Sequence, residues 1–583
     1  MPKNPPAKAQ GRLVLTGRGF GFVHPETGPD ILIPFDHLGT ATSGDTVRVE
    51  LFPESSPDKP AGRVIEVVER SSVPIVGRVR RHGKELRLYP EGQRLNRALV
   101  LDREALAAFR EQLRGKRQLE DGDVVSAKLT RWDDPKAHPV GAPVELVGRR
   151  DDPASEVRMI ALARGFRLDF PEQVVRAAEQ IPAPDPKERR DGRRDLRNET
   201  TFTIDPESAR DFDDALSVRQ LPDGRFQVGV HIADVSHFVG EQSPIDSEAW
   251  QRGTSLYLGN TVLPMLPEQL SNGLCSLVPD QPRFTMTVQA VVDSTGGVSE
   301  VEMFPSVIAS RRRFTYQEVE RVLHGAPDPL APELHLLHLI TQQLRRLREE
   351  DGSVDLDLAS PNITLDENGV PVSIRPSERL HSQRMVEESM LLANRLVAER
   401  LLETGTPAVY RVHDQPRPSD VETLITTLEQ LGIRYRVEDE FTPEDYRNIL
   451  GIIENLEFKD FVEALAMRSL TKAVYDTENR GHFGLAMDAY THFTSPIRRY
   501  PDLIVHRMLK RQLSKRRVRS TPKLISFLNQ TCEHIVERER AATGAERAFT
   551  RLKALQYLEA RVGREYAGTV SGVTSFGLFV EID

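Results

Sequence analysis

Cysteine is nearly absent from this chain. Its 583 residues include two cysteines, Cys275 and Cys532, which lie far apart and have no partners at metal-ligand spacing. A disulfide scaffold and a zinc site are therefore not supported, and both thiols are expected to be buried or inert. Long hydrophobic runs are also missing, since no window approaches about 18 consecutive apolar residues. The opening MPKNPPAKAQGR has no apolar core of a signal peptide, so we expect a cytoplasmic protein without a membrane partner.

The chain also has no excess of positive charge. Its net charge of -9 argues against a coat of basic residues around a nucleic acid, although local basic channels remain compatible with it. Charged residues make up 28% and hydrophobic residues 39%, which is ordinary for a soluble globular protein. The length exceeds what one hydrophobic core holds, and the usual domain size predicts about three to five domains.

Four aspartates, by contrast, crowd into the stretch TFTIDPESARDFDDALSV at 201–218. They are Asp205, Asp211, Asp213 and Asp214. Carboxylates so close repel one another, and a fold keeps them together mainly where a multivalent cation compensates the charge. Apolar neighbours on both sides predict two short strands that feed one pocket. In an extended DFD segment, Asp211 and Asp213 would point to the same side and Asp214 to the other. The cluster predicts a Mg²⁺ site suited to phosphoryl transfer or phosphodiester hydrolysis.

The acidic cluster has two other possible interpretations, an EF-hand loop and a solvated loop. An EF-hand loop counted from Asp205 would place Ala209 at position five, Arg210 at the required glycine and Leu216 at the closing glutamate. That loop therefore fails at three positions. A solvated acidic loop without a metal stays open as the structural alternative.

The N-terminal part predicts a small β-barrel. Residues 11–70 contain five short strand-like segments broken by Gly, Pro and Asp, which is typical of an OB-fold. Within it, Arg18 opens the piece RGFGFV, which matches most of an RNA-binding consensus. Phe20 and Phe22 share one face of a strand, where two rings can stack on successive bases. The alternative is two core phenylalanines beside flexible glycines.

Further along, the pattern changes from strands to helices. Residues 74–150 resemble a second, more diverged barrel with a helical insert at 102–113, and a Pro-rich charged linker follows at 181–198. From about 199 to 520 the pattern predicts one large α+β unit. Capping boxes at Thr315 with Glu318 and at Ser419 with Glu422 predict helix starts, and a long helix is expected after Pro522.

A second concentrated signal is the segment TSPIRRYPD at 494–502. Paired arginines directly after a Ser-Pro turn can present a guanidinium, whose planar fork suits two phosphate oxygens. Paired arginines more often lie on a solvated surface without a function. The segment therefore indicates a phosphate-binding site only in combination with the acidic cluster.

Several segments together resemble the RNase II and RNase R family of exoribonucleases, most closely its RNase R branch. They occur in the family's order: IDPESARDFDDA, HIADVSHFV, RGTSLYLGNTVLPMLPEQLSNGLCSL, MVEESMLLAN, VYRVHDQP and HFTSPIRRYPDLIVHR. The resemblance covers about residues 155–560 as the catalytic (RNB) domain. Its flanks fit two cold-shock-like OB domains and a terminal S1 domain.

The resemblance implies roles for individual residues. The four aspartates would hold Mg²⁺ at the end of a channel for one RNA strand, with Asp213 in a catalytic role. Tyr257 matches a tyrosine that stacks near the RNA 3′ end, and Arg498 matches the arginine on the scissile phosphate. Glu546 aligns with an acidic residue near the same end, and Glu387 or its neighbour Glu388 is expected to reach a ribose hydroxyl. Arg18, Phe20 and Phe22 complete the expected RNA contacts.

The chain also departs from the family pattern. The second stacking aromatic has no clear match, and Ile363 stands near its expected place. A trio of His231, Asp234 and His237 resembles a metal triad, but strand alternation separates His231 from Asp234, so we expect structural hydrogen bonds instead. Residues 563–583 are too short for a complete S1 barrel and predict about two strands.

The sequence thus predicts a multidomain α+β protein. The expected units are a disordered 1–10, an OB domain at 11–70, a second at 74–150, the catalytic domain at 155–560 and an incomplete S1 segment at 563–583. The expected function is processive, Mg²⁺-dependent 3′-to-5′ hydrolysis of single-stranded RNA to nucleoside 5′-monophosphates by a monomer, with no other cofactor. A non-catalytic RNA-binding or chaperone protein is the main alternative, and an endonuclease is a third.

Overall fold

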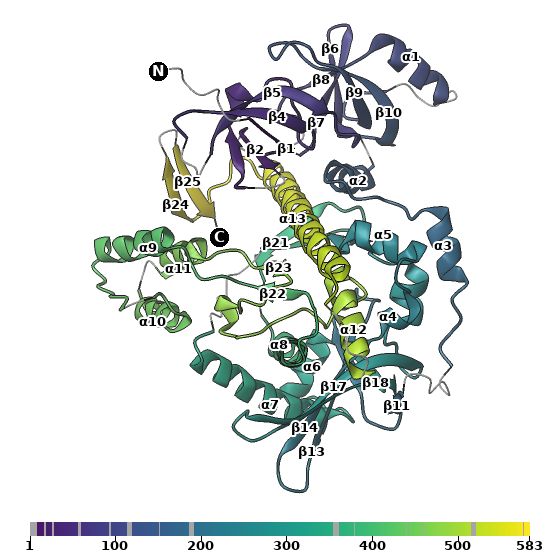
Figure 1. Cartoon of the computed structure of the whole chain (residues 1–583), viewed down its shortest axis with the longest axis vertical. Helices are drawn as coiled ribbons and strands as arrows, with labels where there is room; N and C mark the ends of the chain where they lie inside the picture. Colours follow the sequence, from purple (N-terminus) through teal and green to yellow (C-terminus); the bar gives the residue numbers. More distant parts are fainter. Residues whose placement is uncertain are drawn as a thin grey trace.

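The computed structural model describes residues 8–16, 19–25, 28–55, 60–92, 95–113, 119–150, 152–185, 192–353, 361–377, 379–438, 440–456, 459–514, 520–574 and 577–582 (Figure 1). Two small β units lie at one end of the molecule and a large α+β unit makes up most of the rest. The 38-residue helix α13 (Pro522–Glu559) runs from the β units into the large unit. No helix among these residues is both long and apolar enough to cross a membrane.

The first β unit is a five-stranded sheet in the order β3-β2-β1-β4-β5. A parallel bridge between Leu32 and Ala61 joins its two edges. Alternate residues such as Leu13, Val23 and Val47 fill its interior and are fully buried. Its five strands confirm the prediction from sequence alternation. They are β1 (Lys8–Leu15), β2 (Gly21–Pro25), β3 (Ile31–Ile33), β4 (Thr46–Leu51) and β5 (Gly62–Glu69).

The prediction of a disordered N-terminus at 1–10 is wrong for its last three residues. Strand β1 already begins at Lys8, and its first residues pair with β4 in the register Lys8↔Glu50, Ala9↔Val49 and Gln10↔Arg48. The polar sequence carries no apolar signal there, and hydrogen bonds to β4 hold these residues in the sheet. Residues 1–7 lie outside the described residues.

The second β unit is a closed barrel in the order β10-β8-β7-β6-β9. Helix α1 interrupts it as predicted, and Asp102 caps that helix by accepting hydrogen bonds from the backbone N–H groups of Glu104 and Ala105, both at 3.0 Å. The elements are β6 (Ile75–His82), β7 (Glu85–Pro90), β8 (Leu99–Leu101), α1 (Arg103–Gln112), β9 (Val124–Arg131) and β10 (Val140–Gly148). Helices α2 (Ala154–Ala163) and α3 (Glu172–Glu179) lead into the large unit.

The large unit is built on a seven-stranded mixed sheet in the order β11-β18-β17-β14-β13-β12-β19. Its central strands are buried on both faces, and β14 and β17 are accordingly apolar along most of their length. The strands are β11 (Arg194–Asp195), β12 (Phe202–Asp205), β13 (Asp214–Gln220), β14 (Phe226–Ala233), β17 (Pro282–Val292), β18 (Val298–Ala309) and β19 (Arg312–Thr315).

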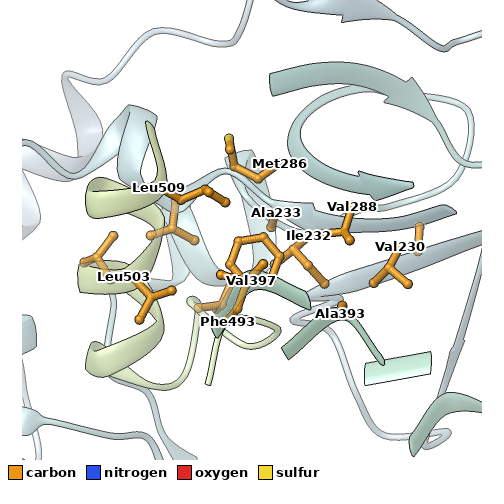
Figure 2. Close-up of a cluster of buried hydrophobic side chains, with 14 of the residues drawn as sticks. Val230, Ile232, Ala233, Met286, Val288, Ala393, Val397, Phe493, Leu503 and Leu509 are labelled. Atoms are coloured by element: carbon orange, nitrogen blue, oxygen red, sulfur yellow. The ribbon is translucent and has the colours of Figure 1, made fainter. Parts of the chain in front are cut away.

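Helices pack on this sheet and enclose the main hydrophobic core. Figure 2 shows Ile232 of β14 and Met286 of β17 close to Val397 of α8 and Leu509 of α12, with Phe493 between them. These side chains are almost fully buried. The helices of the unit are α4 (Val235–Phe238), α5 (Pro244–Arg252), α6 (Tyr316–Leu323), α7 (Ala331–Glu350), α8 (His381–Glu403) and α12 (Tyr500–Leu513).

The helix starts test the two predicted capping boxes. At α6, Thr315 and Glu318 exchange both hydrogen bonds, which confirms the first box. The second is wrong, because α9 already begins at Pro418, so that Ser419 lies inside its first turn. Proline is well suited to the first helical position, since its missing N–H has no partner there in any helix.

The remaining elements form smaller units. Helices α9 (Pro418–Gln430), α10 (Pro443–Ile453) and α11 (Lys459–Ser469) pack around their own apolar cluster. Four two-stranded sheets complete the described chain. Their strands are β15 (Leu256–Leu258) with β16 (Thr261–Leu263), β20 (Pro361–Leu365) with β21 (Pro371–Pro376), β22 (Tyr410–Val412) with β23 (Val474–Asp476), and β24 (Gly568–Thr574) with β25 (Gly577–Ile582).

A buried charge cluster ties the sheet to α12. Asp234 is fully buried, and its carboxylate accepts from Arg193 and Lys510, each at 2.5 Å. Burial alone would raise the pKa of Asp234, but the two cations outweigh it and lower that pKa well below its usual value. A carboxyl whose pKa is lower in the folded state stabilises the protein above its unfolded pKa, and this contribution is lost as the pH falls below it.

We therefore expect Asp234→Asn to lower the free energy of unfolding of the large unit by about 3–5 kcal/mol, because two buried cations lose their counter-charge. Denaturant unfolding followed by circular dichroism at neutral pH measures the loss, which should shrink as the pH is lowered toward 3. Glu302→Gln, which removes an exposed ion pair with Arg194, is the control and should cost at most about 1 kcal/mol. Equal costs for the two variants would contradict the role given to Asp234.

Candidate active site

The four aspartates lie where β12 and β13 meet. Asp205 is the last residue of β12 and Asp214 the first of β13, and the two strands pair antiparallel through Phe202 and Leu216. Buried apolar side chains on both strands anchor the ends of the connecting loop. The prediction of two short strands on either side of the acidic segment is therefore confirmed.

Ser276 and its neighbours hold the loop 206–213 in place. The Ser276 hydroxyl donates to the carbonyl oxygen of Arg210 at 2.7 Å and accepts from the backbone N–H of Phe212 at 3.0 Å. Leu277 N–H donates to the Phe212 carbonyl at 3.0 Å, and Ala233 N–H donates to that of Asp213 at 2.8 Å. These bonds fix the backbone that carries Asp211 and Asp213.

The acidic side chains share one electrostatic environment. Burial and the neighbouring charge of Asp214 raise the pKa of Asp205 to about 8. Burial raises the pKa of Asp214 to about 6, with Arg498 acting in the opposite direction. Burial also raises the pKa of Asp213 well above its usual value, despite Arg498 and a backbone hydrogen bond from Ile497. Clustered and desolvated carboxyls of this kind gain most from a compensating cation.

The donor chemistry of this cluster fits a hard divalent cation. Asp205 Oδ2 and Asp213 Oδ2 are buried and have no hydrogen-bond partner, so two carboxylate oxygens stand free for a ligand. Carboxylate oxygens are what Mg²⁺ prefers. Within the described ranges, no group of three or more His, Cys, Asp or Glu side chains stands in positions that could hold a metal ion. Closing several of the four carboxylates on one ion therefore requires side-chain rotations in the loop.

The segment 495–500, which lies far from the aspartates in the sequence, contacts them in the fold. Ile497 N–H donates to Asp213 Oδ1 at 2.8 Å, and Arg498 Nε lies 3.6 Å from Asp213 Oδ2. The side chain of Arg498 is 45% exposed, so its guanidinium stands at the surface of the site rather than inside the core. An exposed cation beside a buried carboxylate is available to an anionic substrate.

Arg499 plays a different part from its neighbour. Its side chain is only 21% exposed, and it donates to Asp502 Oδ1 at 2.8 Å. Tyr500 is buried, and its hydroxyl donates to Asp246 at 2.9 Å. Both residues therefore support the loop, and Arg498 alone of the three is directed to the aspartates.

Tyr257 joins these two halves. Its hydroxyl donates to Asp211 Oδ2 at 3.3 Å, and burial together with Asp211 raises its pKa. The strand that carries it follows directly on residues that bind the Arg498 segment, since Ser255 N–H and the Thr254 hydroxyl donate to the Arg498 carbonyl at 3.0 and 3.1 Å. The structure thus brings together Asp211, Asp213, Tyr257 and Arg498 from three distant segments.

The remaining predicted acids lie on long helices. Glu546 is exposed on α13, and the flanking residues Ala545 and Phe549 pack against Leu256 and Leu258 beside Tyr257. Although the residue as a whole is exposed, protein atoms around its carboxyl partly exclude water and raise the pKa of Glu546.

On α8 the neighbours Glu387 and Glu388 differ. The Glu387 carboxylate is partly exposed and accepts from Arg379 at 2.6 Å. Glu388 is buried in an ion pair with Arg348 at 2.5 Å, which leaves Glu387 as the more accessible of the two. Ile363 lies on strand β20, and residues 354–360 beside it are outside the described residues.

In the first β unit, Phe20 and Phe22 remain half-buried. Their ring centroids are 5.7 Å apart at an interplanar angle of 80°. Neither ring belongs to the apolar interior of the unit, which Leu13, Val23 and their neighbours fill. This favours available aromatic surfaces over the alternative of two core phenylalanines. Arg18 lies outside the described residues.

His231, Asp234 and His237 do not form a metal triad. His231 is fully buried between the hydroxyls of Ser217 and Thr287, both 2.9 Å from its ring nitrogens. Burial lowers the pKa of His231 to about 3, so the ring is neutral. With Asp234 paired to Arg193 and Lys510, the expected structural hydrogen bonding is confirmed for both residues.

Sequence reasoning missed two residues at the site. Tyr316, at the start of α6, is close enough to Asp214 and Asp205 that their charges add to burial in raising its pKa. Arg313 lowers the pKa of Asp205 and hydrogen-bonds the Pro206 carbonyl. Both reach the site because β19 pairs in parallel with β12, which sets Thr315 opposite Asp205. A pairing across more than 100 residues leaves no local pattern to detect.

Comparisons with known proteins agree with this architecture. The model of the RNB domain matches residues 193–515, that of the Ribonuclease B OB domain 11–67, and that of the cold shock domain 112–171. Ribonuclease R of Aquifex aeolicus is 35% identical over 580 residues, which cover 98% of this chain and 80% of that protein.

Solved structures show the same likeness. Mycoplasma genitalium RNase R in complex with ribose methylated single-stranded RNA superposes with a TM-score of 0.89 at 26% identity, over 98% of this chain and 90% of that one. Yeast Ssd1, described as a pseudonuclease, gives a TM-score of 0.72 at 20% identity over 97% of this chain and 76% of its own, a likeness of fold alone. N-terminal OB-type domains followed by a large RNB domain confirm the predicted fold class.

Proposed function

The chain belongs to the RNB-domain family of ribonuclease R proteins, and from this premise we propose that it is a 3′-to-5′ exoribonuclease. Its substrate is single-stranded RNA, which it hydrolyses processively to nucleoside 5′-monophosphates in RNA turnover in the cytoplasm, as a monomer. The observation that carries the proposal is the meeting of Asp213 with the segment of Arg498, where Ile497 N–H bonds Asp213 Oδ1 at 2.8 Å. A buried acidic cluster faces an exposed guanidinium there.

The choice of substrate rests on the groups that surround this meeting point. Arg498 offers a permanent charge for a phosphate, and Tyr257 offers a ring on which a terminal base can stack. The M. genitalium relative binds single-stranded RNA, which supports the same substrate for this chain. Phe20 and Phe22 supply a further stacking surface, and Glu387 and Glu546 supply acceptors for ribose hydroxyls.

In the reaction, Arg498 holds the non-bridging oxygens of the last phosphodiester and offsets the charge that develops on them. Asp213, oriented by Ile497 N–H, and Asp211, oriented by the Tyr257 hydroxyl, keep fixed carboxylate positions beside the phosphate. Asp205, Asp211, Asp213 and Asp214 would hold Mg²⁺, which when bound polarises the phosphate and makes water a better nucleophile. The Tyr257 ring keeps the 3′ nucleotide aligned, which preserves the attack geometry.

A non-catalytic RNA-binding protein is the second candidate, favoured by the fold shared with the pseudonuclease Ssd1. Such a protein would not need an intact acidic cluster. Here all four aspartates and Arg498 are present, and their backbone is held by Ser276 and Ile497. That support for an acidic site favours the enzyme.

The test uses single-stranded RNA labelled at either end and incubated with the purified protein and Mg²⁺. We expect labelled mononucleotides to appear first from the 3′ label, while the 5′-labelled strand shortens through a ladder or directly to a short end product. Internal fragments from both labels would indicate an endonuclease instead. Intact RNA with tight binding would reject the enzyme in favour of the RNA-binding protein.

A second substrate refines the proposal. A duplex with a 3′ overhang distinguishes an enzyme that proceeds through paired RNA from one that arrests near the junction. Given the similarity to ribonuclease R proteins, we expect complete digestion of the overhanging strand. Arrest near the junction would leave the exoribonuclease assignment in place and limit it to unpaired RNA.

A further inference from the structure

The turn that carries Arg498 has internal supports of its own. Ser495 is 5% exposed and Asp502 is fully buried. The Ser495 N–H donates to Asp502 Oδ1 at 2.8 Å, and Arg499 donates to the same oxygen at 2.8 Å. The Ser495 carbonyl in turn accepts from the N–H groups of Arg498 and Arg499. Asp502 thereby links the start of α12 to the first residue of the turn.

The Ser495 side chain acts on Arg498 itself. Its hydroxyl oxygen accepts from the Arg498 guanidinium at 3.0 Å. Arg498 Nε stands 3.6 Å from Asp213 Oδ2, which is beyond an ordinary hydrogen bond. In the described part of the chain, the Ser495 hydroxyl is thus the one hydrogen-bond acceptor found for this guanidinium.

A half-exposed arginine needs such a contact. Its long side chain has many rotamers in water, and one attractive charge does not select among them. The Ser495 hydroxyl fixes the orientation of the Arg498 guanidinium through a directional hydrogen bond. Asp213 attracts the guanidinium by charge but does not fix its orientation. A guanidinium already aimed at the phosphate loses less conformational freedom when substrate arrives.

From these contacts we infer that Ser495 and Asp502 are positioning residues for the reaction. Asp502 fixes the backbone of Ser495, and the Ser495 hydroxyl aims the Arg498 guanidinium at the scissile phosphate. This inference rests on the proposed function, because it deepens the role given there to Arg498. Neither residue touches substrate in this scheme.

The alternative is that both residues only stabilise the start of α12. An acidic residue in the first turn of a helix does stabilise it through the helix dipole and the free N–H groups. That role accounts for Asp502 and the Ser495 backbone. It does not account for the Ser495 hydroxyl, because that hydroxyl accepts from the half-exposed Arg498 side chain and not from the helix backbone.

A double-mutant cycle separates the two roles. Ser495→Ala is expected to lower the single-turnover cleavage rate about 10- to 100-fold, as small misplacements of a reacting group do. RNA affinity should stay within about twofold, since the phosphate contact is strengthened mainly on the reaction path. In an Arg498→Ala background, Ser495→Ala should have no further effect, because the group it orients is gone. Equal losses in both backgrounds would overturn the inference.

Three further variants control the cycle. Ser495→Thr keeps the hydroxyl and is expected to recover most of the rate. Ser469→Ala removes another buried hydroxyl, which donates to a helix carbonyl in the separate α9–α11 cluster, and should cleave like the wild type. If Ser495→Ala does not fold, Ser495→Cys takes its place in the cycle, because a thiol of similar size is a much weaker acceptor.

A crystal structure of Ser495→Ala gives a readout that does not depend on cleavage. The inference requires the guanidinium to leave its position beside Asp213 in the variant. An unmoved guanidinium would overturn the inference even if the wild type degrades RNA. A wild type that fails to shorten 3′-labelled RNA would instead reject the proposed function, so the two failures are distinguishable.

Discussion

Asp213→Asn is expected to lower the rate of RNA hydrolysis by about three orders of magnitude or more, while RNA binding survives. Asparagine has nearly the same shape, and its carbonyl oxygen can still accept the Ile497 N–H, which now holds Asp213 Oδ1 at 2.8 Å. The loop should therefore keep its fold. What is lost is a negative charge among hard-metal ligands, and a loss of several kcal/mol in transition-state stabilisation corresponds to this rate effect. Single-turnover assays with saturating enzyme measure it.

The same substitution is expected to stabilise the protein when divalent cations are chelated. Because burial raises the pKa of Asp213 in the folded state, ionisation above the unfolded pKa costs stability, and this cost grows as the pH rises toward the folded pKa. Asparagine removes it, so the variant should melt higher than the wild type at pH 7 in chelator. Added Mg²⁺ should raise the melting temperature of the wild type more than that of the variant.

Asp223→Asn serves as the matched control. Asp223 lies in an exposed turn, where it pairs with Arg225 at 2.7 Å, and its loss should change neither cleavage nor the response to Mg²⁺. Fluorescence anisotropy with a labelled strand in chelator checks that RNA affinity is kept. Near-normal turnover of Asp213→Asn would contradict the assigned site, and loss of binding would point to a misfolded loop instead.

Much of the fold could be read from local patterns in the sequence. Alternating apolar residues between Gly, Pro and Asp predicted all five strands of the first β unit, because an OB-type barrel buries one face of every strand. The Thr315 capping box and the long helix after Pro522 followed from hydrogen bonds within one turn. The errors at Lys8 and Ser419 arose where tertiary pairing or a proline decided the boundary.

The candidate site was only partly predictable, for a physical reason. The acidic cluster and the Arg498 turn each lie in one short segment, so composition exposed them. Their meeting depends on contacts across more than 280 residues, such as that of Ile497 with Asp213, and on the bond from Tyr257 to Asp211. Such contacts follow from sheet order and from the packing of α12, which no single sequence periodicity encodes.

The acidic loop combines a local pattern with contacts from distant segments. Strand alternation predicted that Asp211 and Asp213 would point to the same side. In the structure both carboxylates act on the pKa of Tyr257, while Asp211 accepts from the Tyr257 hydroxyl and Asp213 from the Ile497 N–H. The sequence predicts neither partner, because both come from segments that only the fold brings to the loop.

Arg498→Ala is expected to reduce the cleavage rate about 10²- to 10³-fold, as the removal of one preorganised donor at a developing charge does. Arg498→Lys should recover only part of this, because an ammonium keeps the charge but loses the planar fork that spans two phosphate oxygens. RNA affinity should fall less than the rate. The slope of the logarithm of the binding constant against the logarithm of salt concentration should shrink by about 0.7, the value for one lost contact to a single strand.

The neighbouring helix offers the control for Arg498. Arg511→Ala removes an arginine of α12 that is partly exposed and pairs with Glu241 at 2.6 Å, so it tests loss of positive charge without loss of the site. It should cleave like the wild type. Since the side chain of Arg498 is 45% exposed, a lower rate of its alanine variant at an unchanged melting temperature would locate the defect in the reaction rather than in the fold. Cleavage by Arg498→Ala within tenfold of the wild type would mean that the phosphate charge is offset elsewhere, and Arg313, which acts on Asp205, is a candidate.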